Sequence, residues 1–399
     1  MSPDGVFADL VGQDDAVATL RQAARAAAHV VAGEQTGGGA MTHAWIFTGP
    51  PGAGRTLAAR AFAAALECER AGAGCGECHG CHTVLGKTHA DVRFVAPEGL
   101  SIGVGEMRAL VLRAATAPSG GRWQVVVIED ADRLTEAAGN ALLKAIEEPP
   151  PRTVFLLCTP STHPDDISVT IRSRCRVVAL RQPPADAVAA ALVERDGLAS
   201  DTAVWAAAAA QGDIVRARLL AADPEARARR EAVLSVPKRL TGVGACFDVA
   251  AALVAAAKGE ASASVVESDA AERSALEQAL GAGGTGRGAA GAMRGVAGQI
   301  KDLEKRQKSR TTRAQRDALD RALVDLAGFY RDVLITALRA PVPVVHGDVS
   351  PQSEAAARKW TPESALRRLE AVLACRESIN LNVKPEIAVE TMMLNLWKG

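Results

Sequence analysis

The 399-residue sequence is poor in aromatic side chains and carries no net charge. Five Trp, one Tyr and seven Phe make only 13 aromatic residues, so few rings are present on which the bases of a single strand could stack. Lys and Arg together number 46, as do Asp and Glu. This balance argues against a free-standing nucleic-acid binder that neutralises many phosphates by itself. Any contact with DNA is therefore expected to be local or shared with partners.

Long hydrophobic runs and a basic leader are also missing. Hydrophobic residues make up 48% of the sequence, yet no run approaches the roughly 18 to 20 apolar residues of a membrane span. The first residues, Met1–Gly5, lack a basic region followed by an apolar stretch, so no secretory signal is expected. The sequence predicts a soluble, cytoplasmic protein that is long enough for two or three domains.

Four of the eight cysteines fall within fourteen residues, at Cys68, Cys75, Cys78 and Cys81. In a cytosolic chain such clustering favours a metal over disulfides. Two successive C-x-x-C steps bring three thiolates onto one ion, and Cys68 can close a tetrahedron. The spacing predicts a structural zinc (Zn²⁺) site, in which four sulfurs leave no open position for catalysis. A metal-free loop, or a ligand set with His79 or His82 in place of one cysteine, are the alternatives.

The first 180 or so residues alternate short apolar runs with helical patterns, which is typical of a parallel sheet with crossover helices. Three of these runs, 44–48, 125–128 and 154–158, are interpreted as buried strands followed by polar residues. Because open α/β sheets bind their ligands at the carboxyl ends of the strands, the polar residues there form the expected site.

A glycine-rich loop, GPPGAGRT at 49–56, follows the first of these strands and precedes an alanine-rich helix. Its glycines allow backbone N–H groups to approach phosphates, and a threonine hydroxyl can ligate Mg²⁺. The lysine expected before the threonine is an arginine, whose planar fork is not interchangeable with a point charge. The loop therefore either retains ATP and Mg²⁺ in a degenerate site or is only a structural turn. The candidate nucleotide-binding residues of the loop are Gly49, Gly52, Gly54, Arg55 and Thr56.

The second strand is followed by Glu129 and Asp130. Nucleotide-hydrolysing proteins with such a loop place Asp before Glu, so that one holds the magnesium shell and the other polarises water. Here the order is reversed, and the shorter Asp130 would stand back from an attacking water. The sequence therefore predicts weak or absent ATP hydrolysis.

Several segments occur together and in a fixed order. They are Val11-Gly12-Gln13, the glycine loop, the four-cysteine insert, IEDAD at 128–132, NALLKAIEEPP at 140–150 and Ser173-Arg174-Cys175. This string resembles the sliding-clamp loader subunits of bacterial DNA polymerase III, which belong to the AAA-plus class, and most closely their delta-prime group. The resemblance is strong over about residues 5–225 and rests mainly on helical content over 240–399.

The resemblance implies a ring of five subunits with nucleotide at the seams, where an arginine of one subunit completes the site of its neighbour. Arg174 fits this role as an arginine finger acting in trans, which can be worth about 10³ to 10⁵ in rate. From the residues alone, the alternating Arg172, Arg174 and Arg176 could equally form an ordinary solvated face.

Three further residues acquire candidate roles from the resemblance. Thr159 corresponds to a phosphate sensor, with a satisfied turn hydroxyl as the alternative. Val11 lies in the segment that packs on the adenine base. Arg216 falls where hydrolysing relatives have a second phosphate-sensing arginine, with a solvated helix face as the alternative.

The same resemblance predicts three domains. Residues 1–180 would form an AAA-plus nucleotide-binding-like domain containing the insert at 68–81, 181–236 a small helical lid, and 237–399 an all-α collar that mediates oligomerisation. In the last of these, eight of the eighteen residues from 281 to 298 are glycine, so a mobile loop is expected there.

The predicted function is therefore that of a clamp-loader subunit in DNA replication. With the tau/gamma and delta subunits in a hetero-pentamer, it would help to place the sliding clamp on primed DNA, and no membrane is involved. It would be a component of the DNA polymerase III holoenzyme without a polymerase site, hydrolysing little ATP itself. The alternatives are an active tau/gamma-like ATPase motor, disfavoured by Arg55 and the Glu129-Asp130 order, and a zinc-containing DNA-binding module, disfavoured by charge and composition.

Overall fold

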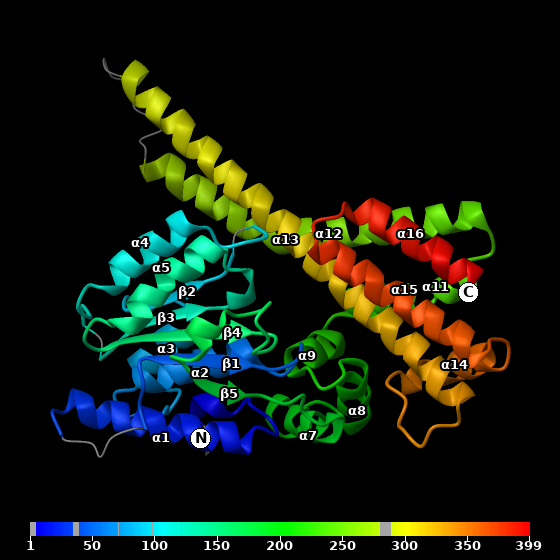
Figure 1. Cartoon of the computed structure of the whole chain (residues 1–399), viewed down its shortest axis with the longest axis horizontal. Coiled ribbons are helices and arrows are strands. Elements are labelled where there is room, and N and C mark those ends of the chain that lie inside the picture. Colours follow the sequence, from blue (N-terminus) through cyan, green and yellow to red (C-terminus); the bar gives the residue numbers. More distant parts are fainter. Residues whose placement is uncertain (1–4, 35–39, 71, 98, 121, 280–288) are drawn as a thin grey trace. The chain divides into compact units, whose positions relative to one another are not determined.

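The computed structural model describes residues 5–34, 40–70, 72–97, 99–120, 122–279 and 289–399. The chain divides into two compact units, Met1–Ala221 and Ala222–Gly399, called here the α/β unit and the helical unit. The predicted architecture, a parallel-sheet α/β region with a glycine loop between β1 and the next helix, followed in the chain by helical regions, is confirmed (Figure 1). The division into three domains stays a prediction.

The α/β unit is built on one parallel sheet. Its strands are β1 (Ala44–Thr48), β2 (Val92–Val95), β3 (Gln124–Ile128), β4 (Thr153–Thr159) and β5 (Arg176–Ala179). They lie in the order β2-β3-β4-β1-β5, and Thr48 at the end of β1 is in register with Thr159 and Ala179. All residues of β1, β3 and β4 are buried, as expected for a sheet covered on both faces.

The helices of this unit that precede β5 cover both faces of the sheet, and the remaining helices follow β5 in the chain. Together they are η1 (Gly5–Phe7), α1 (Asp14–Val31), α2 (Arg55–Leu66), α3 (His79–Leu85), α4 (Val104–Ala114), η2 (Ala131–Arg133), α5 (Glu136–Glu147), α6 (Val169–Arg172), α7 (Ala185–Asp196), α8 (Ser200–Ala209) and α9 (Ile214–Ala222). Trp45 and Phe47 of β1 join a core formed with α1 and α2, whereas Ala44 and Ile46 join a second core with α4 and α5. The alternation follows from the two-residue period of a strand.

Helices α7 to α9 are tied to the N-terminal segment by polar contacts. Arg218 pairs with Asp9 at 2.9 Å and with Asp196 at 2.7 Å, and these hydrogen bonds raise the pKa of its guanidinium. The side-chain oxygen of Gln13 accepts the backbone N–H of Arg181 at 3.1 Å. The segment predicted to form a lid is thus fixed to the beginning of the chain.

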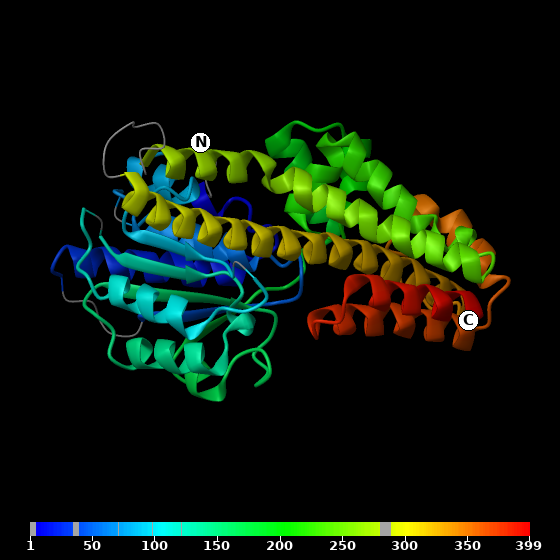
Figure 2. The same cartoon turned by 90° about the horizontal axis from the view of Figure 1, so that it is seen from above.

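The helical unit contains α10 (Pro224–Leu234), α11 (Val236–Arg239), α12 (Val243–Ala279), α13 (Ala289–Ala337), η3 (Gly347–Val349), α14 (Ser350–Ala357), α15 (Pro362–Asn380) and α16 (Pro385–Lys398). The long helices α12 and α13 lie side by side in both views (Figures 1 and 2). Arg310 of α13 bonds Asp269 at 2.8 Å and Glu272 at 2.6 Å on α12. Together with α15 and α16, these helices enclose a core centred on Leu319, Leu323 and Tyr330.

Two predictions for this region were wrong. From the sequence alone, the apolar spacing over 246–258 and over 264–280 indicates two separate helices, but the structure joins them in the continuous helix α12. The expected loop 281–298 lies outside the described residues up to 288, but 289–298 belong to α13. Five of the eight glycines precede that helix, and alanines at 289, 290, 292 and 297 offset the low helix propensity of the other three.

Helix α12 also corrects the expectation about membrane spans. Within the described residues, Val243–Leu276 is long and apolar enough to cross a membrane by length and composition alone. Much of its apolar character comes from alanine. Buried side chains of this helix, including Cys246, Val249 and Leu253, belong to the core of the helical unit, so one side of α12 packs in the interior of that unit.

Candidate functional site: the glycine loop, Arg174 and the four-cysteine cluster

The glycine loop has the backbone that anion binding needs. Gly52 and Gly54 both have a φ of 83°, which L side chains rarely adopt. A Cβ added to Gly49 would lie 2.5 Å from the carbonyl oxygen of Leu180, so only glycine fits there. Helix α2 begins at Arg55, directly after the loop, and the N–H groups of its first turn have no partner within the helix.

The side chain of Arg55 contacts the backbone of its own loop. Nη1 of Arg55 donates to the carbonyl oxygen of Gly49 at 3.1 Å, so the guanidinium closes the loop on itself. A lysine at this position would instead present a compact charge on a flexible stem. The backbone of the loop is thus suited to phosphate, but its cationic side chain is already engaged.

The strand ends bring other predicted site residues to the same place. Ile128, directly before Glu129, is in register with Leu157 of β4, and Thr48, directly before the glycine loop, is in register with Thr159. The thiol of Cys158 lies between these positions of β4 and is buried. Burial raises the pKa of this thiol, which makes Cys158 a neutral core group. The predicted convergence at the carboxyl ends of β1, β3 and β4 is therefore observed.

Glu129, the first carboxylate after β3, is paired within the chain. Nζ of Lys87 lies 2.8 Å from Oε1 of Glu129, whose side chain is 17% exposed. Lys87 follows α3 and the four-cysteine insert, adopts a φ of 58°, and lies over the ring of Phe94 at 5.1 Å. Lys87 thus places its ammonium group beside the carboxylate of Glu129, at the position where nucleotide-hydrolysing proteins have an acidic residue for magnesium or water.

Thr159 and Val11 have local roles in this structure. The Thr159 hydroxyl is buried and donates to the carbonyl oxygen of Ser161 at 3.0 Å, as the turn-hydroxyl alternative expects. Val11 is half-buried in the segment between η1 and α1, two residues before Gln13. Their roles toward a nucleotide stay predictions.

Arg216 lies in the first turn of α9, close to the glycine loop. Asp213 precedes this helix and its carboxylate accepts the backbone N–H of Arg216 at 3.1 Å. A Cβ added to Gly52 would lie 3.1 Å from that of Asp213. The structure therefore brings the start of α9 against the loop, and the nearest carboxylate there opposes rather than attracts a phosphate.

Arg174 lies after α6, and its side chain is 41% exposed. Its Nη2 lies 2.9 Å from Oε1 of Glu147 at the end of α5, and its Nη1 donates to the carbonyl oxygen of Thr170 at 3.0 Å. Arg176, by contrast, bonds the carbonyl oxygen of Ala40 and lies over the Trp45 ring. The alternating arginines therefore do not form one uniform solvated face.

By sequence alone the residues before Arg174, from about Pro164 to Ile171, indicate a helix, but the structure has a shorter one. It is reduced to α6, Val169–Arg172, because the stretch before it is held by side chains instead. Ser161 bonds Asp166, and the N–H of Ile171 bonds the hydroxyl of Ser168. Arg174 is therefore carried by a short turn rather than by a regular helix.

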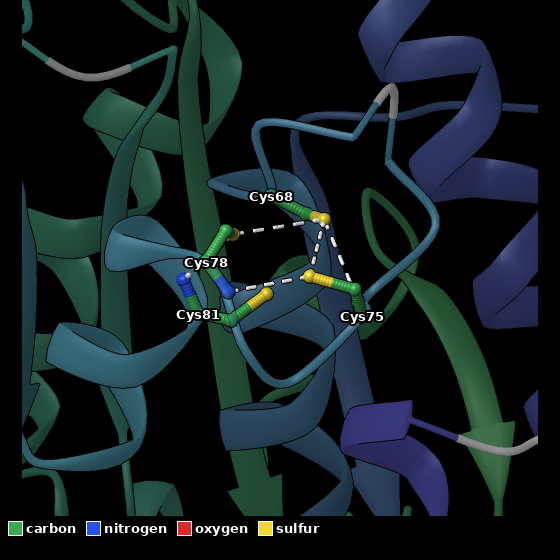
Figure 3. Close-up of side chains that lie close together, drawn as sticks. All are labelled: Cys68, Cys75, Cys78 and Cys81. Carbon is green, nitrogen blue, oxygen red and sulfur yellow. Dashed lines mark hydrogen bonds between the residues drawn. The ribbon is translucent and has the colours of Figure 1, made fainter. Parts of the chain in front are cut away.

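The cysteines of the insert surround one point (Figure 3), and the group consists of Cys68, Cys75, Cys78 and Cys81. Their Sγ atoms all lie within 4.8 Å of one another, with 3.8 Å between Cys68 and Cys75. Four sulfurs bound at about 2.3 Å to a tetrahedral zinc ion would lie about 3.8 Å apart. The predicted ligand set is therefore brought together and fits such an ion, without the histidine alternatives His79 and His82.

Hydrogen bonds and burial give these sulfurs unequal acidities. The N–H groups of Cys78 and Cys81 point at the Sγ atoms of Cys75 and Cys78, at 3.4 and 3.5 Å. Burial alone would raise the pKa of Cys75, but backbone N–H groups of Glu77 and Cys78 hold it at about 7. Burial raises the pKa of Cys81. Four thiolates this close need a bound cation to balance their charge.

Sequence reasoning missed the residues that engage the predicted ones. Lys87 and Glu147 were unassigned, as was Glu67, a buried carboxylate that accepts the N–H groups of Arg122 and Trp123 at 2.9 Å each. Burial raises the pKa of Glu67 to about 7. The only signal for Glu67 in the sequence is its place at the end of an apolar helix, directly before the first cysteine.

Parts of the chain match known replication proteins. Residues 28–184 match the family described as "DNA polymerase III, delta subunit". The chain is 34% identical over 205 residues to DNA polymerase III subunit gamma/tau of Mycobacterium bovis, which covers 50% of this chain and 33% of that protein. It is 42% identical over 147 residues to DNA polymerase III subunit delta' of Pseudomonas aeruginosa, which covers 35% of this chain and 44% of that protein.

The chain thus spans less than half of the length of these curated relatives. Among solved structures, a DNA polymerase III gamma subunit-related protein of Thermotoga maritima is similar over 94% of this chain and 99% of that one, with 15% identity and a TM-score of 0.38. The relatives include both gamma/tau and delta' subunits. The matches therefore support the resemblance to the clamp-loader subunits of DNA polymerase III, without separating its two branches.

Proposed function

We propose that this chain is a delta-prime-like subunit of the DNA polymerase III clamp loader. It supplies Arg174 in trans to the ATP of a neighbouring motor subunit, while hydrolysing little or no ATP itself. Its partners are the tau/gamma and delta subunits of a hetero-pentamer, which loads the sliding clamp onto primed DNA in the cytoplasm.

The observation that carries the proposal is that two charged groups in and beside the chain's own nucleotide loop are bonded to other groups of the same chain. Arg55 donates to Gly49, and Glu129 is paired with Lys87 at 2.8 Å. Hydrolysis requires such groups to act on the triphosphate and its magnesium ion. Arg174 is also paired within the chain, but its pair with Glu147 lies on a turn with both side chains 41% exposed, so a second subunit could reach it.

The four-cysteine insert supports the α/β unit rather than catalysis in this proposal. A zinc ion would be held by Cys68, Cys75, Cys78 and Cys81. Bound there, it fixes the loop that leads to Lys87 and so maintains the pair with Glu129. A set of four sulfurs leaves no position for a reacting water.

The test uses the full chain reconstituted with the motor and delta subunits. Replacing Arg174 with Ala should leave assembly intact and lower the DNA-stimulated ATPase, because the loss of an arginine finger costs about 10³ to 10⁵ in rate at the seam concerned. Arg172→Ala is the matched control, since the Arg172 guanidinium bonds Thr162 of its own chain. An ATPase unaffected by Arg174→Ala would remove the trans role.

An active motor subunit is the second candidate, because a gamma/tau relative matches over 205 residues. The two candidates differ in what the purified chain does alone. A motor would hydrolyse ATP without partners, and a delta-prime-like subunit would not, even when Arg55 is replaced by Lys. Clamp loading with and without the chain then tests whether either role belongs to this process.

A further inference from the structure

The candidate arginine finger is held by a carboxylate of its own chain. Nη2 of Arg174 lies 2.9 Å from Oε1 of Glu147. Nη1 donates to the carbonyl oxygen of Thr170 at 3.0 Å and approaches the hydroxyl of Ser173 at 3.3 Å. Both terminal nitrogens of the guanidinium are therefore used within the chain, although these are the atoms that a phosphate of another subunit would contact.

Glu147 occupies a position where a carboxylate is otherwise unfavourable. It is the last residue of α5, where the unpaired carbonyl groups of a helix give a partial negative charge. Prolines at 149–151 follow and keep the helix from continuing. Arg174 offsets this repulsion. The adjacent Glu148 forms no ion pair within the described part of the chain, so the pairing is specific to Glu147.

We propose that Glu147 is a positioning residue that holds Arg174 on its own domain and yields it to the triphosphate of the neighbouring subunit when the ring assembles. The inference rests on the proposed function of Arg174. It adds that the Arg174 guanidinium exchanges between two anions, Glu147 of its own chain and the triphosphate bound by the neighbouring subunit. Access to Arg174 is then part of how nucleotide is recognised at the interface between the two subunits.

Chemistry and exposure both suit an exchange. A guanidinium binds carboxylate and phosphate through the same planar fork, so Glu147 and the triphosphate compete for the same N–H groups. Both partners of the present pair are 41% exposed. An ion pair open to solvent is weak, and a triphosphate with its several negative charges can displace the carboxylate.

The experiment compares Glu147→Gln with Glu148→Gln, which removes the same charge one residue away. In the reconstituted complex, Glu147→Gln should lower the KM for ATP about two- to fivefold, the range of a solvent-exposed pair, with kcat unchanged. Glu148→Gln should change neither. In an Arg174→Ala background, Glu147→Gln should have no further effect, since a merely structural role of Glu147 would not depend on Arg174.

A second measurement uses the full chain without partners. Phenylglyoxal modifies accessible guanidinium groups, and the rate at Arg174 can be followed by mass spectrometry. Glu147→Gln should raise that rate about two- to fivefold, and Glu148→Gln should not.

The outcomes separate the two proposals. An Arg174→Ala complex with full kcat would overturn the trans role and the exchange together. A lowered kcat in Arg174→Ala, combined with an unchanged KM and an unchanged modification rate in Glu147→Gln, would overturn the exchange alone. A lower kcat in Glu147→Gln would also overturn it, because Glu147 would then orient Arg174 instead of competing for it.

Discussion

The two units of the chain hold their charged groups in different ways. In the α/β unit the ion pairs of interest lie near the surface: Lys87 is 47% exposed where it meets Glu129, and Arg174 is 41% exposed where it meets Glu147. Ligands and partner subunits can reach such pairs, and the pairs themselves contribute little stability.

In the helical unit one cluster of charged groups is instead largely closed off from solvent, although other pairs there, such as Arg310 with Glu272, are partly exposed. The Asp332 carboxylate, 1% exposed, accepts the backbone N–H of His346 at 2.7 Å. The His346 ring contacts the carbonyl oxygen of Asp325 at 2.9 Å and the guanidinium of Arg230 at 3.0 Å, and Arg230 donates to Asp348 at 3.0 Å. Buried groups of this kind are costly to disturb once they are satisfied.

The comparison separates charged groups that a ligand or partner subunit can reach from charged groups that hold the fold together. The charge that is proposed to change partners, that of Arg174, lies on the turn after α6. Charges that fix a loop onto a helix bundle lie inside. The predictions below disturb the α/β unit at two places and the helical unit at one.

The largest effect is expected from removing the metal ligands. Replacing Cys78 and Cys81 with Ser should abolish binding of one zinc per chain, because structural zinc contributes on the order of 10 kcal/mol to folding of its site. Metal analysis of the purified protein measures the loss of zinc. Hydrogen exchange should rise over residues 68–95, including the loop that carries Lys87. Cys246→Ala, in the core of the helical unit, is the control and should retain the ion; wild-type protein purified without any ion would contradict the site.

A smaller effect is expected at the nucleotide loop. Arg55→Lys combined with Lys87→Gln restores a point charge in the loop and releases Glu129 for magnesium. The affinity for Mg-ATP should rise about tenfold, since each change removes a competing contact worth up to about fivefold, and turnover should stay absent. Calorimetric titration measures the affinity. Lys144→Gln, which removes an exposed lysine of α5, is the control. If wild type already binds as tightly as the double variant, the internal pairs do not limit binding.

The sequence predicted the α/β core well because its signals are local. The strands at 44–48, 125–128 and 154–158 are short buried runs, and each was placed within one or two residues. The four-cysteine group and the convergence of Arg55 with Glu129 followed from spacing and from the rule for strand ends. Lys87 and Glu147 could not be found in the same way, since their partners lie 42 and 27 positions away and only the tertiary fold joins them.

The helical unit was predicted less well for a related physical reason. Composition suggested a break near 259–263 and a loop through 298, but α12 and α13 are each stabilised by the other. Pairs such as Arg310 with Glu272 form across the two helices. Packing between long helices overrides weak local propensity, and a single sequence does not show which helices will pair.

The smallest predicted effect tests the closed network of the helical unit. Burial, and next the charge of Arg230, lower the pKa of His346 below its ordinary 6.5, while Asp325 and Asp332 act in the opposite direction. Below about pH 6.5 the folded state therefore binds fewer protons than the unfolded chain. The contribution of neutral His346 to the free energy of unfolding is present above about pH 6.5 and is lost as the pH falls through the lowered pKa. The loss is at most about 1.4 kcal/mol per pH unit. Hydrogen exchange of the loop carrying His346 should accelerate from pH 7.5 to 5.5, after correction for the intrinsic rate, and His346→Gln should remove that dependence. The same dependence in the Gln variant would show that the acid sensitivity arises from groups other than His346, and the buried network would then not be its source.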